Sequence, residues 1–373
     1  MGDRNLSARV PFDTFSLVTY PPVQRSQAFN SADALIVEAA LHESASVETI
    51  VVVNDEFGAL CVATGANTLW TDSWLAQHSS QANLARNQRE PVRVVWSHEA
   101  PTIAPLNIEL VLLRVPKQLA YFEYQLSTLG SLLPTGVPLI AAGMDKHLFS
   151  NTAQLLERYI GPTQRHRGKR KARLFRAVRA DGPVPLFEGH SEFYSEMLDG
   201  QLLSFANGFS RDKVDIGSRF LIEKFSLLAP AKRMIDLASG NGILGLSALK
   251  LDVAQQLVVC DESAMALAAA RANANANLAG AEIQYHHGDG LLDYKGDPAD
   301  LILCNPPFHH NHRVDSAVGK RLLVQSAKHL KRGGRLCVVA NRHLDYLPVL
   351  KREFAQVDKL AQNSKFILWL ARR

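Results

Sequence analysis

The chain has 373 residues, which favours two domains because one hydrophobic core rarely organises so long a chain. With 47% hydrophobic and 21% charged residues, the composition is that of a globular protein and excludes a disordered or fibrous one. Apolar runs stay shorter than the roughly eighteen residues of a membrane span, and the N-terminus MGDRNLSARVPF lacks the apolar stretch of a secretory signal. We therefore expect a cytoplasmic protein with no membrane partner.

The first half of the chain alternates apolar runs with a helical stretch. ETIVVVNDEFGAL (48–60) and VLLRVPK (111–117) contain buried strands, and TDSWLAQHSSQANLARN (71–87) has the composition of a helix between them. This order is typical of an α/β domain.

The formal net charge of +5 is concentrated in one segment. Residues 1–162 carry ten basic and fifteen acidic side chains, a balance of −5, and residues 181–373 carry 23 and 21, a balance of +2. Residues 163–180 carry eight basic side chains and no acidic one, a balance of +8. Gly161-Pro162 and Asp181-Gly182 place turn-forming residues on both sides of the segment.

We interpret this segment as a boundary, which predicts an N-terminal domain over 1–162, a basic connector over 163–184 and a C-terminal domain over 185–373. The connector is either a solvated linker or a strip that contacts phosphate, and clustered cations repel each other unless an anion lies nearby. We therefore favour a strip that contacts phosphate, with these ligands: Arg165, Arg167, Lys169, Arg170 and Lys171.

The second half predicts a parallel sheet with helices between its strands. The expected buried strands are MIDLA (234–238), QLVVC (256–260), DLILC (300–304) and RLCVVA (335–340). The expected helices are Ser263–Asn277 and Lys320–Leu330, the second ended by Gly333-Gly334. Alternation of strand and helix predicts a doubly wound α/β fold.

The two halves of the chain contain similar segments in the same order. The segments 48–60, 71–87 and 111–117 correspond to 233–244, 261–277 and 301–307, and the pairs Ser73 and Ser263, Asn83 and Asn273, and Pro116 and Pro306 are each 190 residues apart. Any two α/β domains share apolar patterns, but a constant offset favours a duplicated domain.

The four cysteines do not form a metal or disulfide pattern. Cys61, Cys260, Cys304 and Cys337 lie far apart without a C-x-x-C pair, and three of them fall in apolar strand-like runs. Buried, reduced thiols are the expected state.

A glycine-rich loop is the strongest local signal in the second half. Asp236-Leu-Ala-Ser-Gly240-Asn241-Gly242 joins a predicted strand to a helix, where glycines let backbone amides approach a ligand closely. Dinucleotide-binding proteins use a similar loop, so this signal alone does not identify the ligand.

Two acidic residues at the ends of the next strands fit an adenosine-containing cofactor. Asp261 follows Gly240 by 21 residues, a spacing at which a carboxylate can accept hydrogen bonds from ribose hydroxyls. Asp289, in His287-Gly-Asp-Gly290, could accept from an adenine amine, although the same residues also form ordinary turns.

The tetrapeptide Asn305-Pro306-Pro307-Phe308 follows the strand DLILC. Two prolines fix an extended backbone without amide donors, which leaves the Asn305 side-chain oxygen and the Pro306 carbonyl as acceptors for a planar NH₂ group. Phe308 can stack on the ring that carries that amine. A rigid turn after a strand is the alternative.

Together these motifs resemble class I S-adenosylmethionine-dependent methyltransferases, and over nearly the whole chain the RsmC/RlmG family of ribosomal RNA guanine-N2 methyltransferases. The resemblance adds Phe209-Ser210-Arg-Asp, Asp215-Ile-Gly-Ser-Arg-Phe220 and Ala340-Asn-Arg-His-Leu344. N-D-E-F-G-A-L at 54–60, V-P-K at 115–117 and N-R-H-L-D-Y at 341–346 are closer to the RlmG branch, which acts on large-subunit RNA, than to RsmC.

The resemblance implies S-adenosylmethionine as cofactor and 23S ribosomal RNA as partner, with no metal and no obligate protein partner. It implies that Asn305, Pro306, Pro307 and Phe308 act at the methyl acceptor. It also implies that the following residues bind the cofactor: Asp236, Gly240, Asn241, Gly242, Asp261, Asp289, Phe209 and Ser210. Many relatives have D-x-G-C-G-N-G in the glycine loop, where this chain has Ala238 and Ser239.

The first half lacks the acceptor asparagine and most loop glycines, so we expect a degenerate methyltransferase domain that positions RNA. The alternatives are methylation of a guanine N2 in 16S RNA, of adenine N6 or of a glutamine amide, or a non-catalytic RNA-binding assembly factor. The adenine and glutamine branches more often have Tyr in the place of Phe308. His309, His310 and His312 lack an acidic or thiolate companion and are expected near RNA phosphate instead of a metal. A G-x-S-x-G nucleophile elbow is absent from the sequence, so hydrolysis is unsupported.

Overall fold

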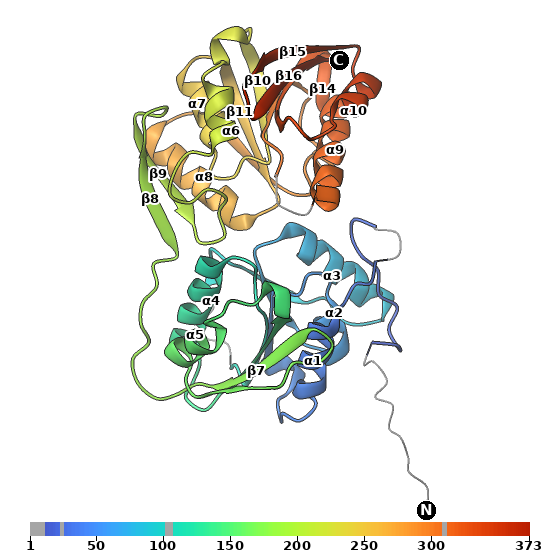
Figure 1. The fold of residues 1–373 in the computed structure, drawn as a ribbon, viewed down its shortest axis with the longest axis vertical. Helices are drawn as coiled ribbons and strands as arrows, with labels where there is room; N and C mark the ends of the chain where they lie inside the picture. The colour runs from blue at the N-terminus through green and yellow to red at the C-terminus, as the bar shows by residue number, and fades with distance from the viewer. Residues whose placement is uncertain (1–11, 23–25, 101–106, 308–311) are drawn as a thin grey trace, which may run out of the picture. The chain divides into compact units, whose positions relative to one another are not determined.

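A computed structural model describes residues 12–22, 26–100, 107–307 and 312–373, with the backbone alone for 312–316. The chain divides into two compact units, Met1–Gly189 and His190–Arg373 (Figure 1). Each unit is described by itself below.

The first unit contains a mixed sheet with helices on both faces (Figure 1). Its strands are β1 (Ile50–Val53), β2 (Thr68–Thr71), β3 (Arg93–Trp96), β4 (Leu110–Arg114), β5 (Pro138–Met144), β6 (Thr163–Arg165) and β7 (Ala172–Val178). Its helices are α1 (Ser31–Ala40), α2 (Ala59–Thr64), α3 (Trp74–Arg86), α4 (Leu119–Leu132) and α5 (Thr152–Tyr159).

The second unit repeats this arrangement and adds a two-stranded hairpin. Its hairpin is β8 (His190–Ser195) and β9 (Gly200–Phe205), and its sheet consists of β10 (Ala231–Leu237), β11 (Ala254–Asp261), β12 (Ile283–His287), β13 (Ala299–Cys304), β14 (Leu330–Asn341), β15 (Gln356–Gln362) and β16 (Phe366–Arg372). Its helices are α6 (Ile216–Ile222), α7 (Ile243–Lys250), α8 (Ala264–Asn277), α9 (His312–His329) and α10 (Leu347–Glu353).

The two sheets have one topology. The strand orders are β3-β2-β1-β4-β5-β7-β6 and β12-β11-β10-β13-β14-β16-β15. The first five strands of each order are parallel, and the last two add antiparallel pairs. The predicted two tandem Rossmann-like α/β domains are confirmed, whereas the antiparallel edge was not predicted.

Residues at the 190-residue offset make equivalent contacts. Ser73 and Ser263 each cap a helix through the amide three residues on, at 3.1 and 3.0 Å. The buried Asn83 side chain bonds the backbone N–H and C=O of Val18, and Asn273 bonds the same two groups of Leu203. A buried amide that pairs with a backbone in the same way in both units is what a duplicated domain predicts.

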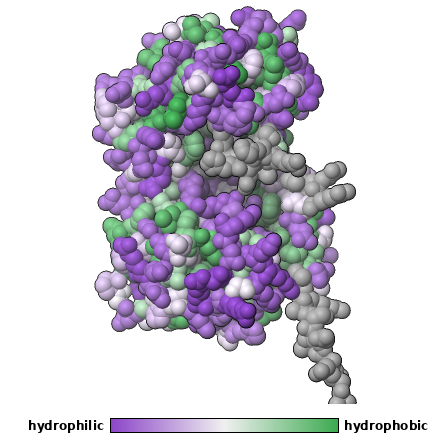
Figure 2. Space-filling model, viewed as in Figure 1, coloured by the Kyte–Doolittle hydropathy of each residue, from purple (hydrophilic) through white to green (hydrophobic). Residues whose placement is uncertain are grey.

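Strand burial explains why these segments form the sheet centres. The IVVV sequence of β1 is buried along its whole length, and the last four residues of β10 are buried as well. Helices on both faces favour apolar side chains in such strands, and Asp236 is the polar exception among these four residues of β10. The face of the molecule in Figure 2 is predominantly hydrophilic, with scattered apolar residues.

The basic segment is part of the first sheet, so the predicted connector over 163–184 is wrong. Residues 172–178 form β7, which pairs with β5 and with β6, and Phe175 is 3% exposed. The neighbours Leu174 and Phe175 point to opposite faces of the sheet and are both buried, so β7 has apolar residues on both faces, which the charge of the segment had concealed. The boundary between the units falls at Gly189.

The end of the second sheet also departs from expectation. Helix α9 runs from His312 to His329, earlier than the predicted Lys320–Leu330. The pair Gly333-Gly334 lies within β14, at an irregularity in its pairing with β13. A glycine with φ +78° at position 333 fits such a bulge.

All four cysteines are buried and unpaired, as the sequence predicts. Burial raises the pKa of the Cys337 thiol to about 12. Within the described residues, every helix is too short or too polar to cross a membrane.

Candidate methyltransferase site

The glycine loop of the second unit joins β10 to α7 at the carboxyl edge of the sheet. Three alternate residues, Ala238, Gly240 and Gly242, have positive φ values of 59°, 56° and 84°. A Cβ built on Gly240 would meet nothing within 4 Å, so the loop has open space in front of this residue. The amides of Ser239, Gly240 and Gly242 donate to the Cys260 carbonyl, to Asp261 and to the Ser239 carbonyl, so the loop offers a ligand the open space at Gly240.

Ala238 occupies the place where relatives often have glycine. Its left-handed backbone costs an alanine about 1–2 kcal/mol. The loop therefore has the shape that glycine would give it, and the departure from the common motif does not change its geometry.

Asp236 connects the strand before the loop to the helix after it. Its Oδ2 accepts a 2.7 Å hydrogen bond from the amide of Gly245 in α7, and its Oδ1 is buried with no hydrogen-bond partner in the described part of the chain. Burial, together with the smaller effect of the negative charge of Asp261, raises the pKa of this carboxyl to about 8.

Asp261, the last residue of β11, lies beside the loop. Its carboxylate accepts from the amide of Gly240 at 2.8 Å and from the amide of Ser263 at 2.9 Å. A carboxylate oxygen can accept more than one hydrogen bond, and ribose hydroxyls are donors of the kind it accepts. Asn241 is held nearby, with its Nδ2 donating to Ser204 Oγ at 3.0 Å.

Asp289 follows β12 as predicted, but its side chain is 4% exposed and forms a 2.7 Å ion pair with Arg321 of α9. A contact with an adenine amine would have to share this carboxylate with Arg321, and the contact stays a prediction. Phe209 and Ser210 lie in the loop between β9 and α6, where Phe209 is 46% exposed.

Asn305 follows β13 directly and contacts the first turn of α6. Its Nδ2 donates to Asp215 Oδ2 and to Ser218 Oγ, both at 2.9 Å. Its Oδ1 is buried and has no hydrogen-bond partner in the described structure. Sequence reasoning noted Asp215 and Ser218 only as part of a motif and missed this contact.

Buried polar atoms are normally hydrogen-bonded, so this unpaired oxygen is a candidate acceptor for an N–H or O–H group of a ligand. Pro306 is buried and Pro307 is half-buried beside it. Phe308, His309 and His310 lie outside the described residues, as does the side chain of His312. No group of three or more metal-ligating side chains occurs among the described residues.

The corresponding edge of the first unit has different chemistry. At the 190-residue offset, Thr71 stands in the place of Asp261 and Val115 in the place of Asn305. Asn54, with φ +63°, follows β1 as Ala238 follows β10, and its side-chain amide forms a reciprocal pair with Gln125 at 2.9 Å in both directions. This edge therefore has no counterpart of Asn305, the proposed acceptor for the amine, or of Asp261, the proposed ribose ligand.

Buried side chains fill the same region of the first unit. Trp70 Nε1 donates to Ser97 Oγ at 3.0 Å, Ser97 Oγ lies 2.5 Å from the Tyr121 hydroxyl, and the Tyr124 hydroxyl donates to the Ser97 carbonyl at 2.6 Å. Buried polar groups that are hydrogen-bonded to one another in this way stabilise this edge of the first sheet.

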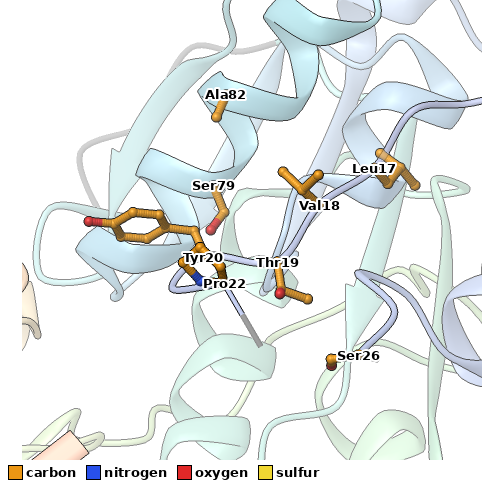
Figure 3. Close-up of a pocket in the computed structure, with 8 residues that line it drawn as sticks. All are labelled: Leu17, Val18, Thr19, Tyr20, Pro22, Ser26, Ser79 and Ala82. Carbon is orange, nitrogen blue, oxygen red and sulfur yellow. The ribbon is translucent and has the colours of Figure 1, made fainter. Parts of the chain in front are cut away.

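A cavity of about 390 Å³ lies elsewhere in the first unit, between the segment 17–26 and helix α3 (Figure 3). Leu17, Val18 and Pro22 give it an apolar wall, and Ser79 directs its hydroxyl toward the segment 19–20 (Figure 3). The cavity does not contain the residues that correspond to the glycine loop.

The five predicted phosphate ligands are exposed in the β6–β7 hairpin of the first unit. Arg170 and Lys171 form its two-residue turn, with φ values of 55° and 60°, and Lys169 pairs with Glu38 at 3.0 Å. Hairpin turns with two positive φ values usually use Asn-Gly, so two long cations here are unusual.

Comparison with known proteins decides the family. Residues 5–181 match the RLMG N-terminal domain and residues 199–369 match the Methyltransferase small domain. The ribosomal RNA large subunit methyltransferase G of Alcanivorax borkumensis is 37% identical over 92% of this chain and 90% of its own length. The Stutzerimonas stutzeri protein of the same name is 37% identical over 96% of this chain and 97% of its own.

The chain belongs to the ribosomal RNA large subunit methyltransferase G family. It is a methyltransferase with a second, degenerate copy of the same fold. A solved 16S rRNA guanine-N2 methyltransferase (RsmC) of T. thermophilus, in complex with AdoMet and guanosine, has the same fold at a TM-score of 0.77, with 19% identity and 92% coverage of both chains.

Proposed function

We propose that this enzyme transfers a methyl group from S-adenosylmethionine to the exocyclic N2 amine of one guanine in 23S ribosomal RNA. The observation that carries the proposal is the buried, unpaired Oδ1 of Asn305 at the end of β13. The family's name supports large-subunit RNA as the substrate. We also propose a cytoplasmic location, because ribosomal RNA is the proposed substrate.

The second unit fits the cofactor. The loop offers open space at Gly240, and Asp261 at its side offers carboxylate oxygens to ribose hydroxyls. Asp236, Asn241 and Gly242 shape the loop, while Phe209, Ser210 and Asp289 are further proposed contacts. The sulfonium of S-adenosylmethionine supplies an electrophilic methyl group, so the protein needs to contribute no metal.

The amine is held by acceptors on this chain. Asn305 Oδ1 and the Pro306 carbonyl accept the two N2 hydrogens, which directs the nitrogen lone pair toward the methyl carbon. As the new N–C bond forms, the C–S bond breaks, and N2 then loses one proton to solvent. Pro307 fixes the backbone and Phe308 stacks on the guanine ring. Since a paired guanine hides N2 in a groove, the target base is unpaired or flipped out.

The basic hairpin of the first unit is proposed to contact RNA phosphate through Arg165, Arg167, Lys169, Arg170 and Lys171. Because Thr71 and Val115 stand in the places of Asp261 and Asn305 in this unit, we assign it to RNA positioning.

The test is transfer from tritiated S-adenosylmethionine to deproteinised 23S and 16S RNA, followed by nucleoside analysis. The proposal predicts N2-methylguanosine in 23S RNA. Label in 16S RNA alone, or in N6-methyladenosine, would assign the site to another acceptor, and cofactor binding without transfer to any RNA would favour an assembly factor.

A further inference from the structure

The first turn of α6 contacts the amide nitrogen of the Asn305 side chain. Asp215, the residue that caps this helix, accepts with Oδ2 from the Ser218 amide at 3.0 Å and from Asn305 Nδ2 at 2.9 Å. Ser218 Oγ accepts the second hydrogen of Nδ2 at 2.9 Å. Both amide hydrogens of Asn305 are therefore used within the second unit.

A planar side-chain amide has its oxygen and nitrogen at opposite corners, so fixing one fixes the other. A carboxylate has no hydrogen to donate, and Asp215 therefore cannot accommodate an inverted amide with Oδ1 in the place of Nδ2. Ser218 alone could accommodate either orientation, because a hydroxyl both donates and accepts. Asp215 is thus the group that decides the orientation.

The space around the free oxygen is preserved by a glycine. A Cβ at Gly217 would lie 3.3 Å from Asn305 Oδ1 and 3.0 Å from Asp215 Oδ2. The turn that locks Nδ2 therefore leaves Oδ1 uncrowded.

We propose that Asp215 and Ser218 are positioning residues that hold the Asn305 amide with its oxygen toward the methyl acceptor. The inference rests on the proposed function, in which that oxygen accepts a hydrogen of the guanine amine. An inverted amide would present Nδ2 to the amine, and two donors would then face each other. The alternative role for Asp215 is a helix cap alone, which Asn fulfils equally well.

The test is a reciprocal exchange of the two side chains in the full-length protein. Asn305→Asp places two carboxylates in contact, and we expect the single-turnover methylation rate on 23S RNA to fall by about 100-fold. Adding Asp215→Asn restores one donor and one acceptor, and we expect it to raise the methylation rate of Asn305→Asp by at least about tenfold. The S-adenosylmethionine affinity of both variants should stay within about twofold of the wild-type affinity.

Asp212→Asn is the matched control, because Asp212 is an exposed acid in the same loop and should give no recovery when combined with Asn305→Asp. If the Asp215→Asn exchange gives no recovery while melting temperature and cofactor affinity match those of wild type, the positioning role is wrong. The wild-type rate is the control for the proposed function itself.

A second readout does not depend on activity. The Asn305 side-chain amide signals, assigned by their loss in Asn305→Asp, should exchange hydrogen slowly in the wild-type NMR spectrum. Asp215→Ser keeps a capping oxygen on a shorter side chain, and we expect exchange of these hydrogens to become at least about tenfold faster. Equal exchange rates in both proteins would overturn the proposal even if no RNA is methylated.

Discussion

The amide of Gly240 donates a 2.8 Å hydrogen bond to the carboxylate of Asp261, which ties the loop after β10 to the end of β11. The cofactor loop and the proposed ribose ligand therefore form one structure. In the first unit Thr71 stands in the place of Asp261, so this connection is absent there.

Asp261→Asn should lower S-adenosylmethionine affinity by about 10- to 100-fold, because a hydrogen bond to a charged group contributes about 1.5–3 kcal/mol. Calorimetric titration of the full-length protein should show one cofactor per wild-type chain. Asp358→Asn, which changes an exposed acid on β15, is the control and should bind normally. A second class of site that survives in Asp261→Asn would contradict the assignment of the cofactor to the second unit alone.

Ala238→Gly should leave the free energy of unfolding unchanged or raise it by up to about 1 kcal/mol, because glycine removes the strain of φ +59° while it gains unfolded-state entropy. Ala276→Gly is the matched change at an exposed position in α8 and should lower stability by about 1 kcal/mol. Urea denaturation measures both. Equal destabilisation by the two variants would show that Ala238 is not strained.

The raised pKa of Asp236, about 8, predicts a pH-dependent stability. Because the folded protein holds this proton more tightly than the unfolded chain does, the contribution is complete below the ordinary pKa near 3.8 and is lost as the pH rises to about 8. Asp236→Asn does not titrate, so its melting temperature should rise relative to wild type between pH 5 and pH 8.

Asp55→Asn provides the control for this titration. Burial raises the pKa of Asp55 to about 6, so the corresponding difference should level off near that pH. A constant difference between wild type and Asp236→Asn from pH 5 to pH 8 would contradict the raised pKa.

The β6–β7 hairpin should carry salt-dependent RNA affinity. Replacing Arg167, Arg170 and Lys171 by glutamine should weaken RNA binding and reduce the slope of log affinity against log salt by roughly two to three, with the methylated guanine unchanged. Binding measured at several salt concentrations gives the slope.

The matched control is the replacement of the exposed Arg86, Arg89 and Arg93 near the opposite edge of the first sheet. It removes the same charge and should change the slope less. Equal slopes for the wild type and the hairpin variant would show that this hairpin does not contact phosphate.

The sequence was enough to predict those parts of the fold and of the site whose residues follow one another closely in the chain. The loop from Asp236 to Gly242 and the asparagine after DLILC were found because a strand, a turn and a polar residue follow one another in the chain. The contact between Asp215 and Asn305 spans 90 residues and leaves no local signal. The β6–β7 hairpin was mistaken for a linker because its many cations hide the short apolar stretch that buries Leu174 and Phe175, and that stretch lacks the alternation typical of a strand.

The central claim is tested most directly by nucleotide mapping of ribosomal RNA from a deletion strain that carries either the wild-type chain or Asn305→Ala. The account predicts that one N2-methylguanine is missing from 23S RNA in the deletion strain, returns with the wild-type chain and stays missing with Asn305→Ala, although that variant binds S-adenosylmethionine normally. An unchanged 23S methylation pattern in the deletion strain, or full restoration by Asn305→Ala, would contradict it.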